Sequence, residues 1–171
     1  DEQFRRALLL TGDGSHLQLP GQTLDGEDTI SITGWLFLPT GASGHIFDFG
    51  KDASNRLFAV ASQEGFRASI VVDGVARGDT AGKPVLENQW VHVAVVLDPA
   101  SRLLTTYLDG AKAGEATNVA VNATQVSQQA AGASNRFFIG RSQNDSEATL
   151  HGRLRDLRIY RIALTDQQVA T

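Results

Sequence analysis

The sequence predicts an all-β domain, either a sandwich or a barrel, on two observations. Short runs rich in Val, Ile, Leu, Phe and Thr recur along the 171 residues, and clusters of Gly, Asp, Asn and Ser separate them. Glycine is frequent, at 17 residues, and only one segment near the C-terminus has the pattern of a helix. We therefore expect antiparallel strands through most of the chain.

The apolar runs give the expected strands, and the polar clusters give the turns between them. Asp73-Gly74 and Asp109-Gly110 each follow an apolar run, and Asp-Gly favours the tight turn of a β-hairpin. The polar stretch 115–134 has little aromatic content and predicts a long loop or a weak edge strand. The strands are expected at residues 6–10, 16–19, 29–37, 45–49, 56–61, 66–72, 90–97, 103–108, 137–140 and 150–160.

At most one short C-terminal helical turn is expected. Thr165 and Gln168 have the spacing of a capping box, in which each side chain bonds the backbone N–H of the other residue. Val169 follows as a residue that could face a core.

The last expected strand has an interrupted alternation. Leu154 and Leu157 are three residues apart, which breaks the period of two. A β-bulge near Arg155 and Asp156 would restore the alternation, and a bulge re-aims the side chains around it. The sequence therefore marks Asp156 as a residue with a special orientation.

Composition narrows the function classes. Without cysteine the chain forms no disulfide, thiolate zinc site or cysteine nucleophile. The net charge, 15 − 19 = −4, disfavours binding to nucleic acid, and the longest apolar run, 93–97, is too short to insert into a membrane. The length predicts a single domain over residues 1–171, and a chain that starts at Asp1 and lacks Met is expected to be cut from a larger protein.

Three ordered groups of segments carry a family resemblance. They are Ile30-Ser31-Ile32-Thr33-Gly34-Trp35-Leu36, then Trp90-Val91-His92-Val93-Ala94-Val95-Val96 with Tyr107-Leu108-Asp109-Gly110, then Phe138-Ile139-Gly140-Arg141 with 150–160 and Ala163-Leu164-Thr165. Together they resemble the laminin-G-like jelly-roll domains of the concanavalin A-like lectin/glucanase superfamily. The resemblance implies two antiparallel sheets packed face to face, with long loops at one end.

The resemblance also implies a function in recognition. We expect a non-catalytic module that binds carbohydrate, with a glycan or an extracellular polysaccharide as its partner. Its place would be outside the cell or on the cell surface, secreted or periplasmic if the source is bacterial. The alternative is a structural or protein–protein module that positions a neighbouring catalytic domain of the parent protein.

Glycoside hydrolysis is the enzymatic alternative, because some members of the superfamily are glucanases. Retaining hydrolysis needs two carboxylates about 5–5.5 Å apart. The sequence has no Glu-x-Asp-x-x-Glu pattern, and the neighbours Glu27 and Asp28 would face opposite sides of a strand. The sequence therefore predicts that the domain is not an enzyme.

Two polar loops supply the candidate ligand-binding residues, because planar polar side chains suit sugar hydroxyls. Asn55 and Arg56 lie in the first loop, and Arg141 and Asn144 lie in the second. Aromatic faces also bind sugars, but Trp35 and Trp90 match core tryptophans of the family that the chain resembles. We expect both tryptophans in the core.

The resemblance further implies a structural calcium ion. Asp156 matches an aspartate that holds calcium in several superfamily members, and Gly12 and Asp13 lie in the matching early turn. Alternatively, Asp13 caps a turn, and Asp156 pairs with a nearby arginine such as Arg155 or Arg158.

Arginines cluster near the C-terminus and suggest an acidic sugar as a ligand. The bulge is expected to divide them between the two faces of the strand, which favours solvated ion pairs instead. The cluster comprises Arg153, Arg155, Arg158 and Arg161.

Overall fold

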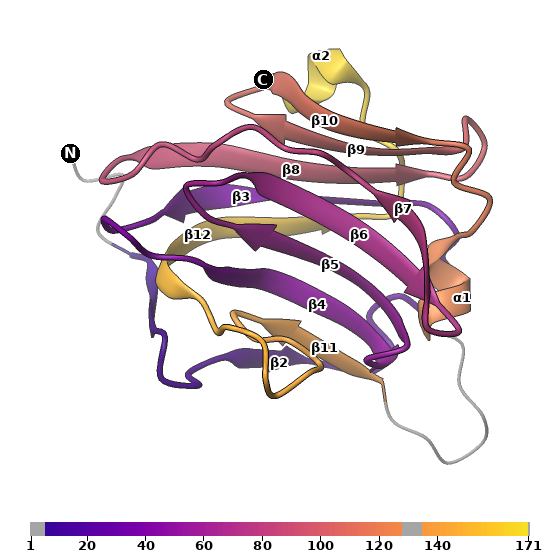
Figure 1. The fold of residues 1–171 in the computed structure, drawn as a ribbon. Helices are drawn as coiled ribbons and strands as arrows, with labels where there is room; N and C mark the ends of the chain where they lie inside the picture. Colours follow the sequence, from indigo (N-terminus) through magenta and orange to yellow (C-terminus); the bar gives the residue numbers. More distant parts are fainter. Residues whose placement is uncertain (1–5, 128–134, 171) are drawn as a thin grey trace.

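The computed structural model describes residues 6–127 and 135–170, which form two antiparallel 6-stranded sheets packed face to face (Figure 1). This confirms the all-β sandwich. Sheet A has the order β1 (Leu8–Thr11), β12 (His151–Tyr160), β3 (Ile30–Phe37), β8 (Trp90–Asp98), β9 (Leu103–Leu108) and β10 (Ala111–Thr117). Sheet B has the order β2 (Leu17–Leu19), β11 (Arg136–Ile139), β4 (Gly44–Asp52), β5 (Asn55–Ala61), β6 (Phe66–Val72) and β7 (Val75–Asp79).

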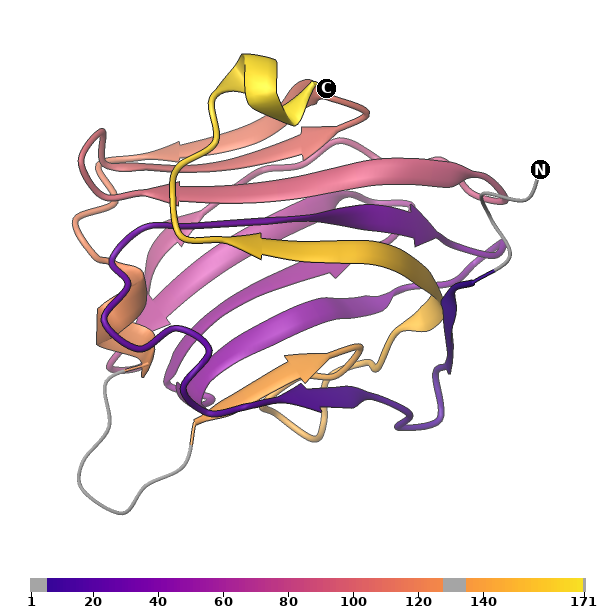
Figure 2. The same cartoon turned by 180° about the vertical axis from the view of Figure 1, so that it is seen from behind.

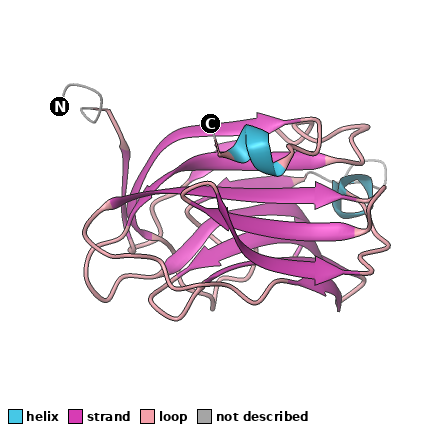
Figure 3. Ribbon diagram, turned by 90° about the horizontal axis from the view of Figure 1, so that it is seen from above, coloured by secondary structure: helices cyan, strands magenta, loops and turns pink. Residues whose placement is uncertain are grey.

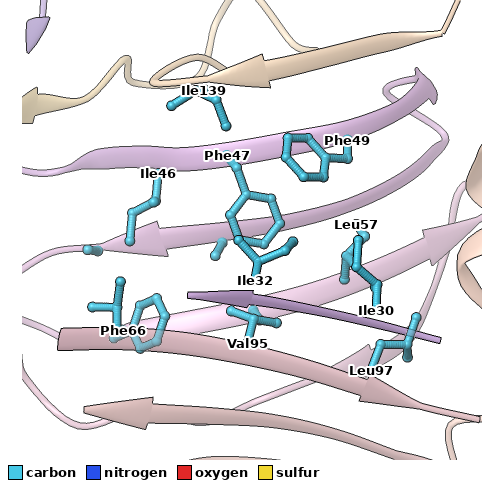
Figure 4. Packing of buried hydrophobic residues seen from close by; sticks show 14 of the residues in the cluster. Ile30, Ile32, Ile46, Phe47, Phe49, Leu57, Phe66, Val95, Leu97 and Ile139 are labelled. Carbon is cyan, nitrogen blue, oxygen red and sulfur yellow. The ribbon is translucent and has the colours of Figure 1, made fainter. Parts of the chain in front are cut away.

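The core lies between the two sheets and is built by the period-two alternation of their strands. Ile32 of β3 lies across the interior from Phe47 of β4, and Ile30 of β3 lies near Leu57 of β5 (Figure 4). Every second residue of β3 faces this core, so the residues between them face outward. The alternation thus creates two outer faces, and these carry the candidate sites.

Both expected hairpins are confirmed. Asp73 and Asp109 have φ angles of 53° and 48°, and the following glycines are also left-handed, as the tight hairpin turn requires. Each turn continues into a strand, β7 or β10, that the sequence did not predict. These are edge strands of small and polar residues, so their alternation is weak.

The stretch 115–134 contains a second short helix, so the expectation of a single helical turn was wrong. After β10 ends at Thr117, α1 (Ala123–Ser127) packs Ala123 and Val126 into the core. Asn122 and Gln125 bond each other's backbone N–H, which is the same reciprocal cap that the sequence revealed at Thr165. Residues 128–134 of this stretch lie outside the described residues.

The C-terminal segment crosses the outer face of sheet A. The connection after β12 passes in front of β3 and β8 and leads to α2 (Asp166–Val169) (Figure 2). The expected Thr165–Gln168 capping box is present. Ser31 Oγ fixes the connection by donating to Ile162 O (2.7 Å) and accepting from Leu164 N (3.0 Å).

α2 is held by a small apolar cluster of its own. Val169 packs against Ala94, Val96 and Tyr107 on the outer face of sheet A. The two short helices are the helical elements of the described residues (Figure 3), and neither has the length and apolar character needed to cross a bilayer.

Candidate ligand-binding site

The predicted β-bulge is present in β12. The register of β12 against β3 shifts between Arg155 and Arg158, and Asp156 has a φ of 52°. Arg155 pairs with Trp35 and Arg158 pairs with Thr33, so the extra residue keeps both arginines on one face. The expectation that the bulge divides the arginines between the two faces of the strand was therefore wrong. The bulge compensates for the three-residue spacing of Arg155 and Arg158, so their side chains stay on the same face.

Trp35 and Trp90 both lie outside the core, which corrects the expected placement. Ile32 and Leu36 of β3 are buried between the sheets, so Trp35 faces outward from sheet A. Trp90 begins β8 on the same outer face, where its ring lies 5.7 Å from that of Phe37. Both indoles are half-buried.

The outer face of sheet A contains a hollow of about 410 Å³, called here the sheet A hollow. This volume is in the range of small-molecule sites. β3 and β8 supply Trp35 and His92, whose rings are 5.3 Å apart in a T-shaped arrangement. The remaining lining comes from Thr33 of β3, from the Asp109–Gly110 turn, from Asp156, Arg158 and Tyr160 of β12, and from Leu164, Gln168, Val169 and Ala170 around α2.

Polar groups in the hollow are held by specific bonds. Arg158 donates through Nε to Asp156 Oδ1 (2.9 Å) and through Nη2 to Asp156 Oδ2 (2.8 Å). Hydrogen bonding to Asp156, and then to Tyr160, raises the pKa of Arg158. Asp109 Oδ1 accepts from the backbone N–H of His92 (2.8 Å). Burial lowers the pKa of His92, although the negative charges of Asp109 and Asp156 oppose this, so its ring favours the neutral form.

A second polar group, called here the Arg56 cluster, lies on the outer face of sheet B. Arg56 Nη1 donates to Asp48 Oδ2 (2.8 Å), Ser142 Oγ (2.8 Å) and Glu147 Oε2 (2.9 Å), while Nη2 donates to Glu147 Oε1 (2.9 Å). The guanidinium lies 4.3 Å from the centre of the Phe58 ring. The cluster comprises His45, Asp48, Arg56, Ser142 and Glu147.

The two carboxyl groups of the Arg56 cluster are shifted in opposite directions. Burial raises the pKa of Asp48, against hydrogen bonds from Gln143 N–H and Arg56. The hydrogen bond from Arg56 lowers the pKa of Glu147 to about 2. Two neighbouring carboxyl groups whose pKa values are shifted in opposite directions occur in catalytic acid–base pairs, but structural ion-pair networks produce the same pattern. The Asp48 side chain is 0% exposed and Arg56 lies between the carboxylates, so the arrangement is that of a structural network.

His45, Asp48 and Glu147 also bring ligand atoms within 4.8 Å of one another, which is close enough to hold a metal ion. The fit to calcium is poor, because calcium binds six to eight oxygens and His45 offers nitrogen. His45 Nε2 lies 3.1 Å from Glu147 Oε2 without hydrogen-bond geometry. Arg56 already supplies a positive charge to both carboxylates.

The structure brings two of the four predicted loop residues, Arg56 and Asn144, to a common partner. Arg56 and Asn144 both bond Glu147, and Arg141 lies in the same loop as Asn144. Arg141 pairs with Asp145, and its guanidinium lies 5.3 Å from the centre of the Phe138 ring. The side chain of the fourth residue instead fixes a hairpin: Asn55 Oδ1 accepts from Asp73 N (3.0 Å).

The residues predicted for calcium are not brought together. Thr11 pairs with His151, so Gly12 and Asp13 lie beyond one end of the β1–β12 pair, and Asp156 lies five residues further along β12, at roughly 16 Å. Both alternatives are confirmed. Asp13 Oδ1 caps its turn by accepting from Thr11 Oγ1 (2.6 Å) and Ser15 N (3.2 Å), and Asp156 pairs with Arg158.

Known proteins with the same architecture are distant in sequence. The SAP-like pentraxin from Limulus polyphemus is 18% identical (TM-score 0.65), with 96% of this chain and 79% of that chain covered. The CBM40 of the Ruminococcus gnavus IT-sialidase, solved with alpha2,3 sialyllactose, is 13% identical (TM-score 0.75; 97% and 96% covered). Domain 4 of AbnA, an extracellular arabinanase from Geobacillus stearothermophilus solved with arabinotriose, is 24% identical (TM-score 0.63; 96% and 74% covered).

No curated protein has a sequence that matches this one. A family model does match, and it covers residues 11–170, from the end of β1 to the end of α2. The match includes both sheets, the bulge and the C-terminal segment that bounds the sheet A hollow. The chain therefore belongs to the Laminin_G_3 family of the concanavalin A-like lectin/glucanases superfamily.

Proposed function

We propose that the chain is a glycan-recognition module that binds sugar in the sheet A hollow. The observation that carries the proposal is the half-buried indole of Trp35, placed in one concavity with the hydrogen-bonding groups of Asp156 and Arg158. An indole face packs against the apolar face of a sugar ring, and charged or planar polar groups bond its hydroxyls. The glycans bound by the CBM40 and the AbnA domain add support.

We propose that the module is non-catalytic. The carboxylates of Asp48 and Glu147 lie within 4.8 Å of each other, but Arg56 joins them and Asp48 is enclosed, so no glycosidic bond could lie between them. In the hollow, both oxygens of Asp156 accept hydrogen bonds from Arg158, which is the geometry of an ion pair rather than that of a proton donor. We further propose that the module serves a larger extracellular or cell-surface protein.

The loop residues on sheet B remain a second proposed location for the ligand. Arg141 and Asn144 keep partly exposed side chains beside Phe138 and Glu147. Arg56 is less suited to direct contact, because all of its bonds described above go to neighbouring side chains. Variants on this face therefore belong in the same binding experiment.

The test is a glycan array followed by calorimetric titration of the strongest hit. Trp35→Ala is expected to weaken binding by about tenfold or more, because it removes the stacking face. Trp90→Ala is the matched control, since Trp90 is half-buried on the same outer face but lies outside the hollow. Loss of binding with Arg141→Ala and Asn144→Ala, but not with Trp35→Ala, would move the site to sheet B.

The alternative is a structural or protein-docking module. An array without binding, obtained with protein shown to be folded by circular dichroism, would contradict glycan recognition. It would favour a module that positions a neighbouring domain of the parent protein.

We propose that the Arg56 cluster is held together by its own ion pairs and needs no bound calcium ion. We expect the melting temperature to be the same in calcium and in a chelator. Asp48 and Glu147 are already paired with the Arg56 side chain, which a chelator cannot remove. Differential scanning calorimetry in each buffer measures this. A midpoint that falls by several degrees in chelator would show that a bound cation contributes to stability.

A further inference from the structure

We propose that Asp156 and Arg158 form a clasp for two adjacent hydroxyl groups of a sugar, and that the β-bulge at Asp156 aims this clasp into the sheet A hollow. This inference rests on the proposed function and adds the ligand feature that the hollow recognises. It makes Asp156 and Arg158 the residues that determine specificity, while Trp35 supplies the stacking surface.

The backbone at Asp156 is the first support. Six residues other than glycine have positive φ within the described residues, and five of them lie in turns or loops. Asp156, at 52°, is the sixth and lies inside a strand. The left-handed conformation costs energy for a residue with a Cβ atom, although Asp and Asn adopt it more readily than most, and the bulge also interrupts the ladder to β3.

The ion pair between Asp156 and Arg158 contributes little to folding stability to offset this backbone strain. The Asp156 and Arg158 side chains are 43% and 58% exposed, and exposed ion pairs contribute little to folding because water and salt screen them. Strained backbone occurs preferentially at functional sites. The bulge keeps Leu157 and Ile159 against the core, and it also leaves the exposed Asp156–Arg158 pair lining the sheet A hollow, where a ligand can reach it.

The chemistry of the pair fits a vicinal diol. The bidentate bond uses two of the five N–H donors of Arg158, Tyr160 accepts from another, and each oxygen of Asp156 keeps a further lone pair. One hydroxyl can accept from the guanidinium while its neighbour donates to the carboxylate, and the mutual neutralisation of the pair suits an uncharged ligand. A sugar without adjacent hydroxyls could use only half of this arrangement.

The position of the pair relative to Trp35 fits a single sugar ring. Arg158 is opposite Thr33, two residues along β3 from Trp35, which corresponds to roughly 7 Å. A ring stacked on Trp35 would thus present its edge to the clasp. Other ionisable groups lining the hollow are His92, Asp109 and Tyr160; Asp109 is engaged by the His92 N–H, and Arg155 lies outside the lining.

The decisive variant is Asp156→Gly. It removes the carboxylate, and glycine adopts the left-handed conformation freely, so the bulge is retained. We expect unchanged or higher stability together with about tenfold weaker binding of mannobiose, cellobiose or arabinotriose, whichever binds the wild-type protein. Asp156→Asn, which also tolerates positive φ, should bind with intermediate affinity because its amide accepts through one oxygen only.

The ligand control uses the same oligosaccharides after periodate cleavage between adjacent hydroxyl-bearing carbons and borohydride reduction. These should bind the wild-type protein and Asp156→Gly equally weakly. Unchanged binding by Asp156→Gly, or a large fall in its melting temperature, would overturn the inference. If Trp35→Ala still abolishes binding in that case, glycan recognition stands and only the clasp fails; if no probe binds the wild-type protein, both fail.

Discussion

Arg56→Met should lower the free energy of unfolding by about 3–5 kcal/mol, the range found when one partner of a buried ion pair is removed. Methionine keeps much of the packing against Phe58 but leaves the carboxylate of Asp48 enclosed without a cation. Glu147 and Ser142 also lose their bonds to the guanidinium, so the loop 140–149 loses its attachment to β5. Urea unfolding monitored by tryptophan fluorescence measures the change.

The matched control for this prediction is Arg141→Met. Arg141 pairs with the exposed Asp145, and such surface pairs contribute about 0–1 kcal/mol. The double variant Asp48→Asn/Arg56→Met should regain part of the lost stability, since the buried negative charge is removed as well. Equal effects of Arg56→Met and Arg141→Met would show that the cluster does not stabilise the fold.

Phe49→Ala should cost about 3–5 kcal/mol, as large-to-small substitutions of buried phenylalanine do. Phe49 is fully buried, and its ring centre lies 4.8 Å from that of Phe47 and 5.4 Å from that of Phe137. The neighbouring strands are hydrogen-bonded on both sides of β4, so the cavity cannot collapse easily. The midpoint of urea unfolding should therefore fall strongly.

Leu86→Ala is the control for Phe49→Ala, because Leu86 is 61% exposed and surface substitutions change stability by about 0.5 kcal/mol or less. If Phe49→Ala unfolds at the wild-type urea concentration, the ring contacts of Phe49 with Phe47 and Phe137 would not contribute to stability.

The strands that could be predicted from the sequence are those with a buried apolar face. β6 and β9 begin and end where the apolar runs do, and the bulge in β12 was visible because two leucines are three residues apart. The edge strands β7 and β10 were missed because few of their residues face the core. α1 was missed although Asn122 and Gln125 carry the spacing of a reciprocal cap.

The sites were harder to predict, because they depend on which residues meet across strands far apart in the sequence. The alternation of Ile32, Trp35 and Leu36 could have placed the indole outside the core, but the family resemblance was followed instead. Arg56 was expected to contact ligand, yet it is enclosed by Asp48 on the neighbouring strand and by Glu147, which is distant in the sequence. The hollow needs α2 to return to β3 and β8, and the sequence does not specify that return.

The position of β12 has a consequence for how the chain folds. β12 lies between β1 and β3, so a strand near the end of the domain pairs with two strands near its beginning. Until it arrives, both of those strands have an unpaired edge that could associate with another chain. Such distant pairing slows folding, because a long loop must close before its contacts form. We therefore expect sheet B, built mostly from consecutive hairpins, to form first, and the hollow to be completed last.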